Sequence, residues 1–284
     1  MEKKEKCGRR KFLKISATAL ATVPILPSFS YGAPLRHETL QVWSCGGLAE
    51  AFMPANAHYK EKTGVYIAYT GAFAAALGKS LLGGARTEVF APRVLDLAKK
   101  LRTENKMLYF KPLCFTQYVV VTPKGNPSSI QSIHDLARPG VQVVLSPQAS
   151  PPGGDAVNWI LKKAGIYEAV RENTVIQGSC VQTTMDDLIS KKGDASVVEM
   201  RLTRMERFTG QVEIIPIPDE FIPPVPRTFT IGVMKDAKER ELADHYVNFI
   251  CSEEGQYFFE QAGFIPALSE KGKNLIEKFG VKDA

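Results

Sequence analysis

Short apolar runs alternate with amphipathic stretches from residue 40 almost to the end of the chain. Residues 40–43 predict a buried strand, residues 48–62 a helix, and residues 65–69 the next strand. Further strands are predicted at 88–90, 118–122, 141–145, 175–176, 195–198, 213–217 and 228–234, and further helices at 74–82, 155–164, 181–189, 238–251, 253–262 and 270–279. This alternation favours an α/β fold built on parallel sheets. In such sheets a ligand binds at the carboxyl ends of strands, where loops lead into helix N-termini.

The positive charge of the chain is concentrated at one end. The 284 residues carry a net charge of +6, from 36 Lys and Arg against 30 Asp and Glu. Residues 1–32 contain seven of the basic residues and two of the acidic ones, so five of the six net charges lie there. The rest of the chain is nearly neutral. We therefore do not expect a nucleic-acid partner, which an evenly basic surface would have suggested.

Residues 1–32 resemble a secretory signal peptide. A basic stretch is followed by an apolar run over 15–29 and by small residues at Ser30 and Gly32. The apolar run is short and contains two prolines, so it does not predict a permanent membrane span. Residues 9–14, Arg-Arg-Lys-Phe-Leu-Lys, closely resemble the twin-arginine export motif. We expect recognition by the twin-arginine export machinery, cleavage after Gly32, and a soluble periplasmic protein; an ordinary basic export signal is the alternative.

Four cysteines remain in the predicted mature chain: Cys45, Cys114, Cys180 and Cys251. An oxidising compartment permits disulfides, but the sequence has no C-x-x-C pair and cannot choose among the three possible pairings. The four histidines are scattered without metal-ligand spacing, and neither a G-x-S-x-G motif nor a P-loop occurs. We therefore expect neither an enzyme nor a resident cofactor.

Five segments of the sequence, in this order along the chain, resemble those of one protein family. They lie at residues 48–64, 77–90, 118–124, 151–153 and 249–264. Together they make residues 38–265 similar to the molybdate-type periplasmic solute-binding proteins of ABC importers. The resemblance implies a type II periplasmic binding protein fold, in which two α/β lobes close on a ligand between them.

The resemblance also implies a domain organisation and a set of partners. One lobe is expected to contain residues 33–116 and 227–284, and the other residues 117–226. The proline-rich stretch 216–226 is the candidate hinge, with a rigid surface loop as the alternative. The expected partners are a small inorganic ion as cargo and the permease of an ABC transporter, and the protein is expected to be a monomer. Whether it serves a transporter or a sensor stays open.

In the molybdate- and tungstate-binding members, hydroxyls and backbone N–H groups from several loops hold the oxoanion. Helix N-termini and unpaired amides suit a negative charge, which is the physical basis of such sites. The corresponding positions in this chain are Ser44, Cys45, Gly46, Gly47, Gly71, Ala72, Ser150, Gly153, Ser179, Cys180, Val181 and Glu199.

Several side chains depart from the family pattern. The second loop, at residues 71–75, carries no hydroxyl, while Cys45, Cys180 and Glu199 bring thiols and a carboxylate. Thiolate and carboxylate suit a transition metal better than an oxoanion, so Cys45, Cys180 and Glu199 form an alternative site for a metal or a thiol-reactive ion. In the other interpretation the cysteines are small apolar residues, and Glu199 forms a salt bridge with Arg201 or Arg227. A cysteine-dependent enzyme is a further alternative, but no histidine lies near either thiol in the sequence.

Overall fold

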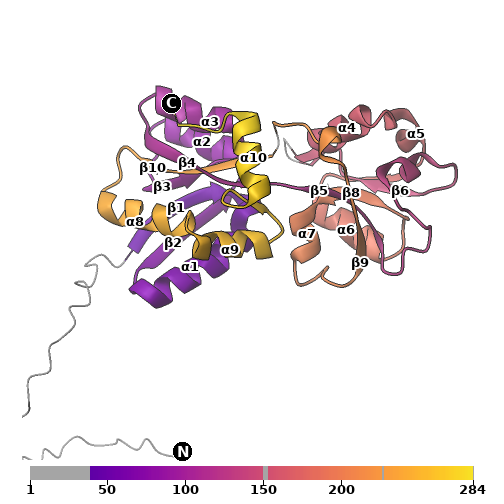
Figure 1. The fold of residues 1–284 in the computed structure, drawn as a ribbon, viewed down its shortest axis with the longest axis horizontal. Coiled ribbons are helices and arrows are strands. Elements are labelled where there is room, and N and C mark those ends of the chain that lie inside the picture. The colour runs from indigo at the N-terminus through magenta and orange to yellow at the C-terminus, as the bar shows by residue number, and fades with distance from the viewer. Residues whose placement is uncertain (1–38, 150–152, 226, 284) are drawn as a thin grey trace, which may run out of the picture. The chain divides into compact units, whose positions relative to one another are not determined.

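The strands and helices build two α/β lobes in the computed structural model, which describes residues 39–149, 153–225 and 227–283 (Figure 1). The predicted export signal and Ser150 lie outside the described residues. Within the described part of the chain, no helix is long and apolar enough to cross a membrane.

The first lobe is built on a six-stranded sheet with the order β11-β4-β10-β3-β1-β2. Its strands are β1 (Thr39–Cys45), β2 (Tyr66–Ala72), β3 (Val89–Ala91), β4 (Met107–Phe115), β10 (Thr228–Met234) and β11 (Ile265–Pro266). β1 is parallel to both β2 and β3, but β10 is antiparallel to β3 and β4, and β11 is antiparallel to β4. The sheet is therefore mixed, and the prediction of a parallel sheet holds only for its first three strands. Parallel neighbours need a crossover helix, whereas β10 enters this sheet directly from the other lobe.

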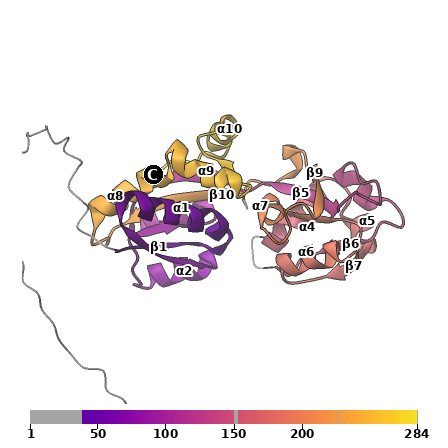
Figure 2. The same cartoon turned by 90° about the horizontal axis from the view of Figure 1, so that it is seen from below.

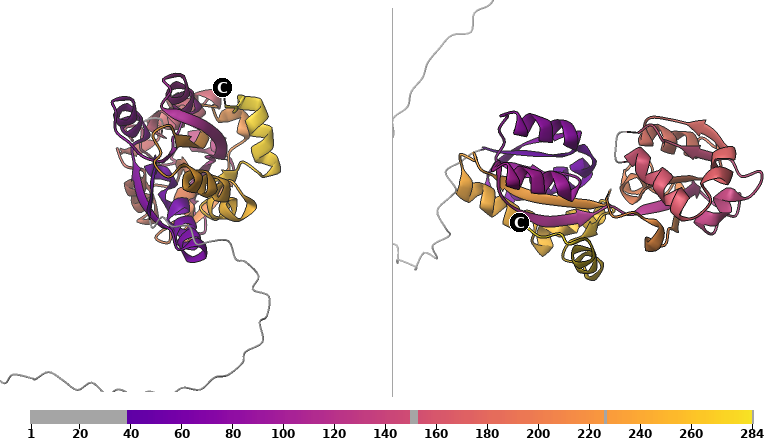
Figure 3. Two further views of the ribbon diagram at one scale, coloured as in Figure 1. Left: turned by 90° about the vertical axis from the view of Figure 1, so that its left-hand side faces the viewer. Right: turned by 90° about the horizontal axis from the view of Figure 1, so that it is seen from above.

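Helices cover both faces of this sheet, as Figures 2 and 3 show. They are α1 (Ala49–Thr63), α2 (Ala74–Leu82), α3 (Leu95–Thr103), α8 (Arg240–Ile250), α9 (Glu253–Gln261) and α10 (Glu270–Phe279), with a short 3-10 turn, η1 (Gly46–Leu48), before α1. Successive strand residues point to opposite faces. Val89 and Ala91 accordingly join the core under α1, α8 and α9, while Phe90 joins the core under α2 and α3.

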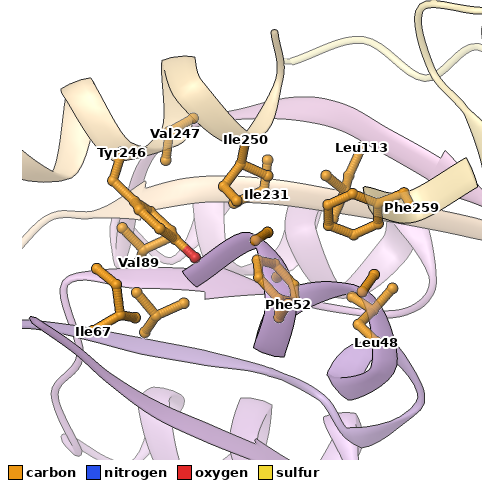
Figure 4. Packing of buried hydrophobic residues seen from close by; sticks show 14 of the residues in the cluster. Leu48, Phe52, Ile67, Val89, Leu113, Ile231, Tyr246, Val247, Ile250 and Phe259 are labelled. Atoms are coloured by element: carbon orange, nitrogen blue, oxygen red, sulfur yellow. The ribbon is translucent and has the colours of Figure 1, made fainter. Parts of the chain in front are cut away.

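Aliphatic and aromatic side chains together fill the larger of these cores (Figure 4). Phe52 of α1 meets Phe259 of α9 edge to face, with ring centroids 5.2 Å apart. Tyr59 and Tyr246 are likewise edge to face, and Tyr246 donates its hydroxyl hydrogen to Asn56 Oδ1 at 2.5 Å. This packing ties the C-terminal helices α8 and α9 to the N-terminal α1.

The second lobe contains a three-stranded sheet of order β8-β5-β9 and a parallel pair β6-β7. The strands are β5 (Tyr118–Pro123), β6 (Val143–Leu145), β7 (Thr174–Gln177), β8 (Ser196–Glu199) and β9 (Val212–Pro216). The helices are α4 (Gly153–Lys163), α5 (Tyr167–Glu172), α6 (Val181–Ile189) and α7 (Met200–Arg204), with 3-10 turns η2 (Ile133–Ala137) and η3 (Asp219–Phe221). A bridge between Val143 and Ala195 joins the two sheets. Tyr118 and Val120 of β5 face the core under α4 and α5, and Val119 and Val121 face the core under α6 and α7.

The chain passes between the lobes from β4 to β5 and returns from β9 to β10. The two crossings are bonded to each other at Arg227, whose side chain is fully buried. The Thr116 N–H donates to the Arg227 carbonyl at 2.8 Å, and Arg227 Nε donates to the Thr116 carbonyl at 3.3 Å. Arg227 Nη2 also pairs with Asp219 Oδ1 at 3.0 Å. The backbone and the guanidinium of Arg227 thus both bind the first connection at Thr116.

Candidate functional site

A cavity of about 720 Å³ is lined by loops of both lobes. In the first lobe these loops follow the carboxyl ends of β1, β2 and β3. In the second lobe they precede α4 and α6 and follow β8. The site thus lies where an α/β fold places ligands, at strand ends that lead into helices.

Nine of the twelve residues predicted from the sequence line this cavity: Cys45, Gly46, Gly47, Ala72, Gly153, Ser179, Cys180, Val181 and Glu199. Ser44 does not, because its side chain is fully buried and its hydroxyl lies 2.6 Å from the Tyr69 hydroxyl. Gly71 also lies outside the lining. Ser150 falls outside the described residues.

Helices α2 and α6 are among those that begin at the cavity wall. The N-cap of α2 is Phe73 and the N-cap of α6 is Cys180, and neither side chain completes a capping hydrogen bond. The first N–H groups of a helix have no partner within the helix, and they carry its positive partial charge. These two helix ends therefore offer hydrogen-bond donors to an anion in the cavity.

The loops of the second lobe are fixed by close packing and by hydroxyl contacts. A Cβ atom added at Gly154 would lie 2.5 Å from the Pro147 carbonyl oxygen, so only glycine allows α4 to begin this close to the preceding loop. The hydroxyls of Ser146 and Thr184 contact each other. Each of them also donates to the Cys180 carbonyl at 3.3 Å. The start of α6 is therefore held in place from beneath the cavity.

A buried ion-pair network stands at the carboxyl end of β8. Arg93 Nη2 pairs with Glu199 Oε1 at 2.7 Å, and Arg201 Nε pairs with Glu199 Oε2 at 2.6 Å. The Tyr118 hydroxyl lies 3.1 Å from Arg93 Nη2 and 3.3 Å from Glu199 Oε1. Burial alone would raise the pKa of Glu199, but the two guanidiniums outweigh it and lower the pKa to about 2. Glu199 is therefore ionised at neutral pH.

Arg201 also reaches the first lobe. Its Nη1 lies 3.4 Å from Oε1 of Glu50, in the first turn of α1. A Cβ atom added at Gly263, just after α9, would lie 3.1 Å from the Arg201 backbone, and Gly263 has a φ of +85°. Glycine is thus required where the first lobe meets Arg201.

This network disfavours the alternative metal site at Cys45, Cys180 and Glu199. Both oxygens of Glu199 are occupied by guanidinium groups, and Cys45 is buried while Cys180 is exposed. Across residues 39–149, 153–225 and 227–283, no group of three His, Cys, Asp or Glu side chains could hold a metal ion. The alternative salt bridge between Glu199 and Arg201 is confirmed, whereas Arg227 pairs with Asp219 instead. All four cysteines of the described chain are free.

The two thiols in the cavity differ in their ionisation. Burial raises the pKa of Cys45, although the neighbouring Arg93 partly opposes that change. The pKa of Cys180 is lowered, chiefly because the backbone N–H and the side chain of Thr183, in the first turn of α6, stabilise the thiolate. The thiol of Cys180 lies at the helix end and is therefore the more readily ionised of the two.

Positive charge dominates the cavity lining. Arg93, Arg201, Lys79 and Lys100 line it against the single carboxylate of Glu199, a net charge of +3. From the sequence, Arg201 was named only as a possible salt-bridge partner of Glu199, and the other three cations were not placed at the site. The rule that ligands bind at strand ends could have found two of the four, since Arg93 lies two residues beyond β3 and Arg201 two residues beyond β8.

The backbone beside Arg93 is strained. Val94 has a φ of +76°, which a β-branched residue rarely adopts. Its N–H donates to the Thr228 carbonyl at 2.9 Å, and this contact with β10 holds the conformation. Strain of this kind concentrates at functional sites, and here it lies on the cavity wall.

The model of the family of bacterial extracellular solute-binding proteins matches residues 40–265. The chain belongs to this family. The molybdate-binding protein ModA of Mycobacterium bovis is 27% identical over 230 residues, covering 80% of this chain and 84% of that protein. A sulfate-binding protein of Synechococcus elongatus is 24% identical over 305 residues, covering 92% of this chain and 84% of that protein.

Solved structures show the same fold. The periplasmic molybdate-binding protein of Azotobacter vinelandii superposes with a TM-score of 0.65 at 17% identity, covering 80% of this chain and 98% of that chain. The two-lobe α/β architecture expected from the sequence is therefore confirmed. The relatives named above are molybdate- and sulfate-binding proteins.

Proposed function

We propose that this chain is the solute-binding component of an ABC importer and that it captures a tetrahedral oxoanion of the molybdate, tungstate or sulfate type. One observation carries the proposal: loops of both lobes meet at one cavity, where two uncapped helix N-termini and a net positive charge face the same space. The molybdate- and sulfate-binding relatives support the same class of ligand.

Binding is expected to rest on backbone donors. The N–H groups at the start of α2 and α6 donate to the oxoanion oxygens from opposite lobes. Arg93 and Arg201 add positive potential, and Glu199 holds both guanidiniums in place. Closure of the lobes then removes water, and this strengthens each charge-assisted hydrogen bond.

The cellular role is part of the proposal. The sequence of residues 1–32 supports export through the twin-arginine machinery and a periplasmic location, and the family description agrees with a protein outside the cytoplasm. We expect a monomer that delivers its cargo to a permease and needs no resident cofactor. Loss of labelled oxoanion uptake in a strain lacking this chain would separate transport from sensing.

Thermal unfolding of residues 33–284 with molybdate, tungstate, sulfate or zinc chloride, at equal ionic strength, tests the proposal. An oxoanion at a hundred times its Kd should stabilise the protein by about 2.7 kcal/mol, which raises the Tm by roughly 5–10 °C in a chain of this size. Zinc should give no comparable rise. Absence of a rise with every oxoanion would overturn the proposed function.

A proline substitution tests the donor at α6 separately. Val181 is the first residue of α6, where proline is tolerated but removes the N–H. Val181→Pro should weaken oxoanion binding roughly 10- to 100-fold, because a charge-assisted hydrogen bond contributes about 1.5–3 kcal/mol. Glu270→Pro makes the same change at the first residue of α10, outside the cavity lining, and should leave binding unchanged.

A further inference from the structure

One wall of the cavity is apolar and comes from the first lobe. Ala72 and Phe73 form the turn between β2 and α2, Leu82 ends α2, and Val94 and Leu97 belong to the start of α3. Phe73 is 44% exposed, although its ring is among the larger apolar groups of the chain. The side chains of these five residues contain no polar atom, and the loop 71–75 has no hydroxyl side chain.

The two helices of this wall are packed closely by a glycine. A Cβ atom added at Gly78 of α2 would lie 2.6 Å from Leu97 Cδ1 of α3. A larger residue at this position would force the Leu97 side chain to move. Phe73 is at the same time the N-cap of α2. Its ring therefore stands directly beside the helix end where an anion is expected.

A bare oxoanion has no group that could cover such a wall. Its oxygens are all hydrogen-bond acceptors, whereas removal of apolar surface from water is favourable in proportion to the area buried. The cavity volume of about 720 Å³ also falls in the range of about 300–1,000 Å³ that is typical of sites for organic ligands.

We infer that the bound oxoanion carries an apolar substituent, as alkyl or aryl sulfonates and phosphonates do. The charged head lies at the N-termini of α2 and α6, and the substituent covers Phe73 and the wall behind it. The inference rests on the proposed function, because the head uses the same backbone donors as a bare oxoanion.

The positions of Lys79 and Lys100 limit the length of the apolar substituent. Both line the cavity, and neither forms an ion pair with another residue in the part of the chain that the structure describes. Lys79 is five residues beyond the start of α2, which corresponds to roughly 8 Å along a helix. An apolar body of about that length fits between the head site and the positive charge.

Calorimetric titration with methane-, butane- and hexanesulfonate tests the inference, since all three carry one negative charge. Each added methylene that is buried should raise affinity about threefold to fourfold, and the gain should end once the wall is filled. Phe73→Ala, which removes the ring without adding a capping hydroxyl at the start of α2, should abolish most of this dependence on chain length. Tyr257→Ala, at a side chain of α9 that is 55% exposed, is the matched control and should keep the full dependence.

Two results separate the inference from the proposed function. If molybdate or sulfate binds and the affinity for the sulfonates does not change with chain length, the inference of an apolar substituent is wrong and the proposed function stands. If neither the inorganic oxoanions nor the sulfonates bind, the proposed function itself is wrong. Val181→Pro should weaken every member of the series by the same factor, because the substitution removes a donor to the shared head. An unequal loss would contradict placement of the head at α6.

Discussion

Removal of the Glu199 charge should destabilise the protein by about 3 kcal/mol at pH 7. The pKa of Glu199 is about 2 against an ordinary 4.5, and one pKa unit corresponds to about 1.4 kcal/mol. Glu199→Gln leaves the buried guanidinium of Arg93 without its counter-ion. Loss of one partner of a buried ion pair typically costs about 3–5 kcal/mol, which agrees with the first figure. The Tm should fall by roughly 6–12 °C.

The destabilisation caused by Glu199→Gln should become smaller as the pH falls. Because the folded-state pKa of Glu199 is depressed, the stabilisation is fully present above about pH 5 and is lost as the pH falls toward 2. Urea unfolding of ligand-free protein, followed by circular dichroism, measures the free energy of unfolding of both forms. The difference between them should shrink to about 40% of its pH 7 value at pH 3.

A surface ion pair provides the control. Glu168 lies 3.5 Å from Arg171, and its side chain is 76% exposed. Glu168→Gln should therefore change stability by less than about 0.5 kcal/mol. A loss below about 1 kcal/mol for Glu199→Gln at pH 7, or a loss of equal size at pH 7 and pH 3, would refute the electrostatic reasoning.

Three further predictions concern the cavity and the core. Iodoacetamide near pH 8 should modify Cys180 before Cys45, because the pKa of Cys180 is lowered and that of Cys45 is raised. Peptide mass spectrometry with and without oxoanion should show slower modification when the anion is bound. Equal modification rates for the two thiols would contradict the assignment. Replacing Lys79 and Lys100 by Gln should slow oxoanion association at low salt by roughly tenfold in stopped-flow measurements, and the difference should vanish near 0.5 M salt. Phe259→Ala should cost about 3–5 kcal/mol in calorimetric unfolding, since Phe259 is fully buried, and a cost under 1 kcal/mol would mean that the core closes around the gap.

Local sequence pattern predicted the elements that have clear ends. Residues 74–82 were predicted as a helix and form α2, which stops at Gly83. The strand β4 was missed because Lys111 and Pro112 interrupt its apolar run. Pro112 is tolerated there because it lies at an irregularity in the pairing with β10, where a missing N–H does little harm.

Strand direction and side-chain partners were harder to predict. No local pattern shows that β10 runs antiparallel to its neighbours, since its direction follows from the return of the chain from the second lobe. The cavity loops could be predicted because strand ends fix their position. Of the two partners of Glu199, Arg201 was a predicted candidate, but Arg93 was not, because it lies 106 residues away in the sequence. Without Arg93, the role of the carboxylate stayed open between a ligand-binding group and a salt bridge.

The contact between Arg201 and Glu50 affects the overall affinity of the protein but not its selectivity among ligands. The contact joins a strand end of the second lobe to the first turn of α1, so rotation of one lobe against the other must change it. Glu50 does not line the cavity. Glu50 therefore acts only on the equilibrium between open and closed lobes. A shift of that equilibrium changes the apparent affinity for every ligand by the same factor. Substitutions at Glu50 would shift the working concentration range of the protein while preserving the rank order of its ligands.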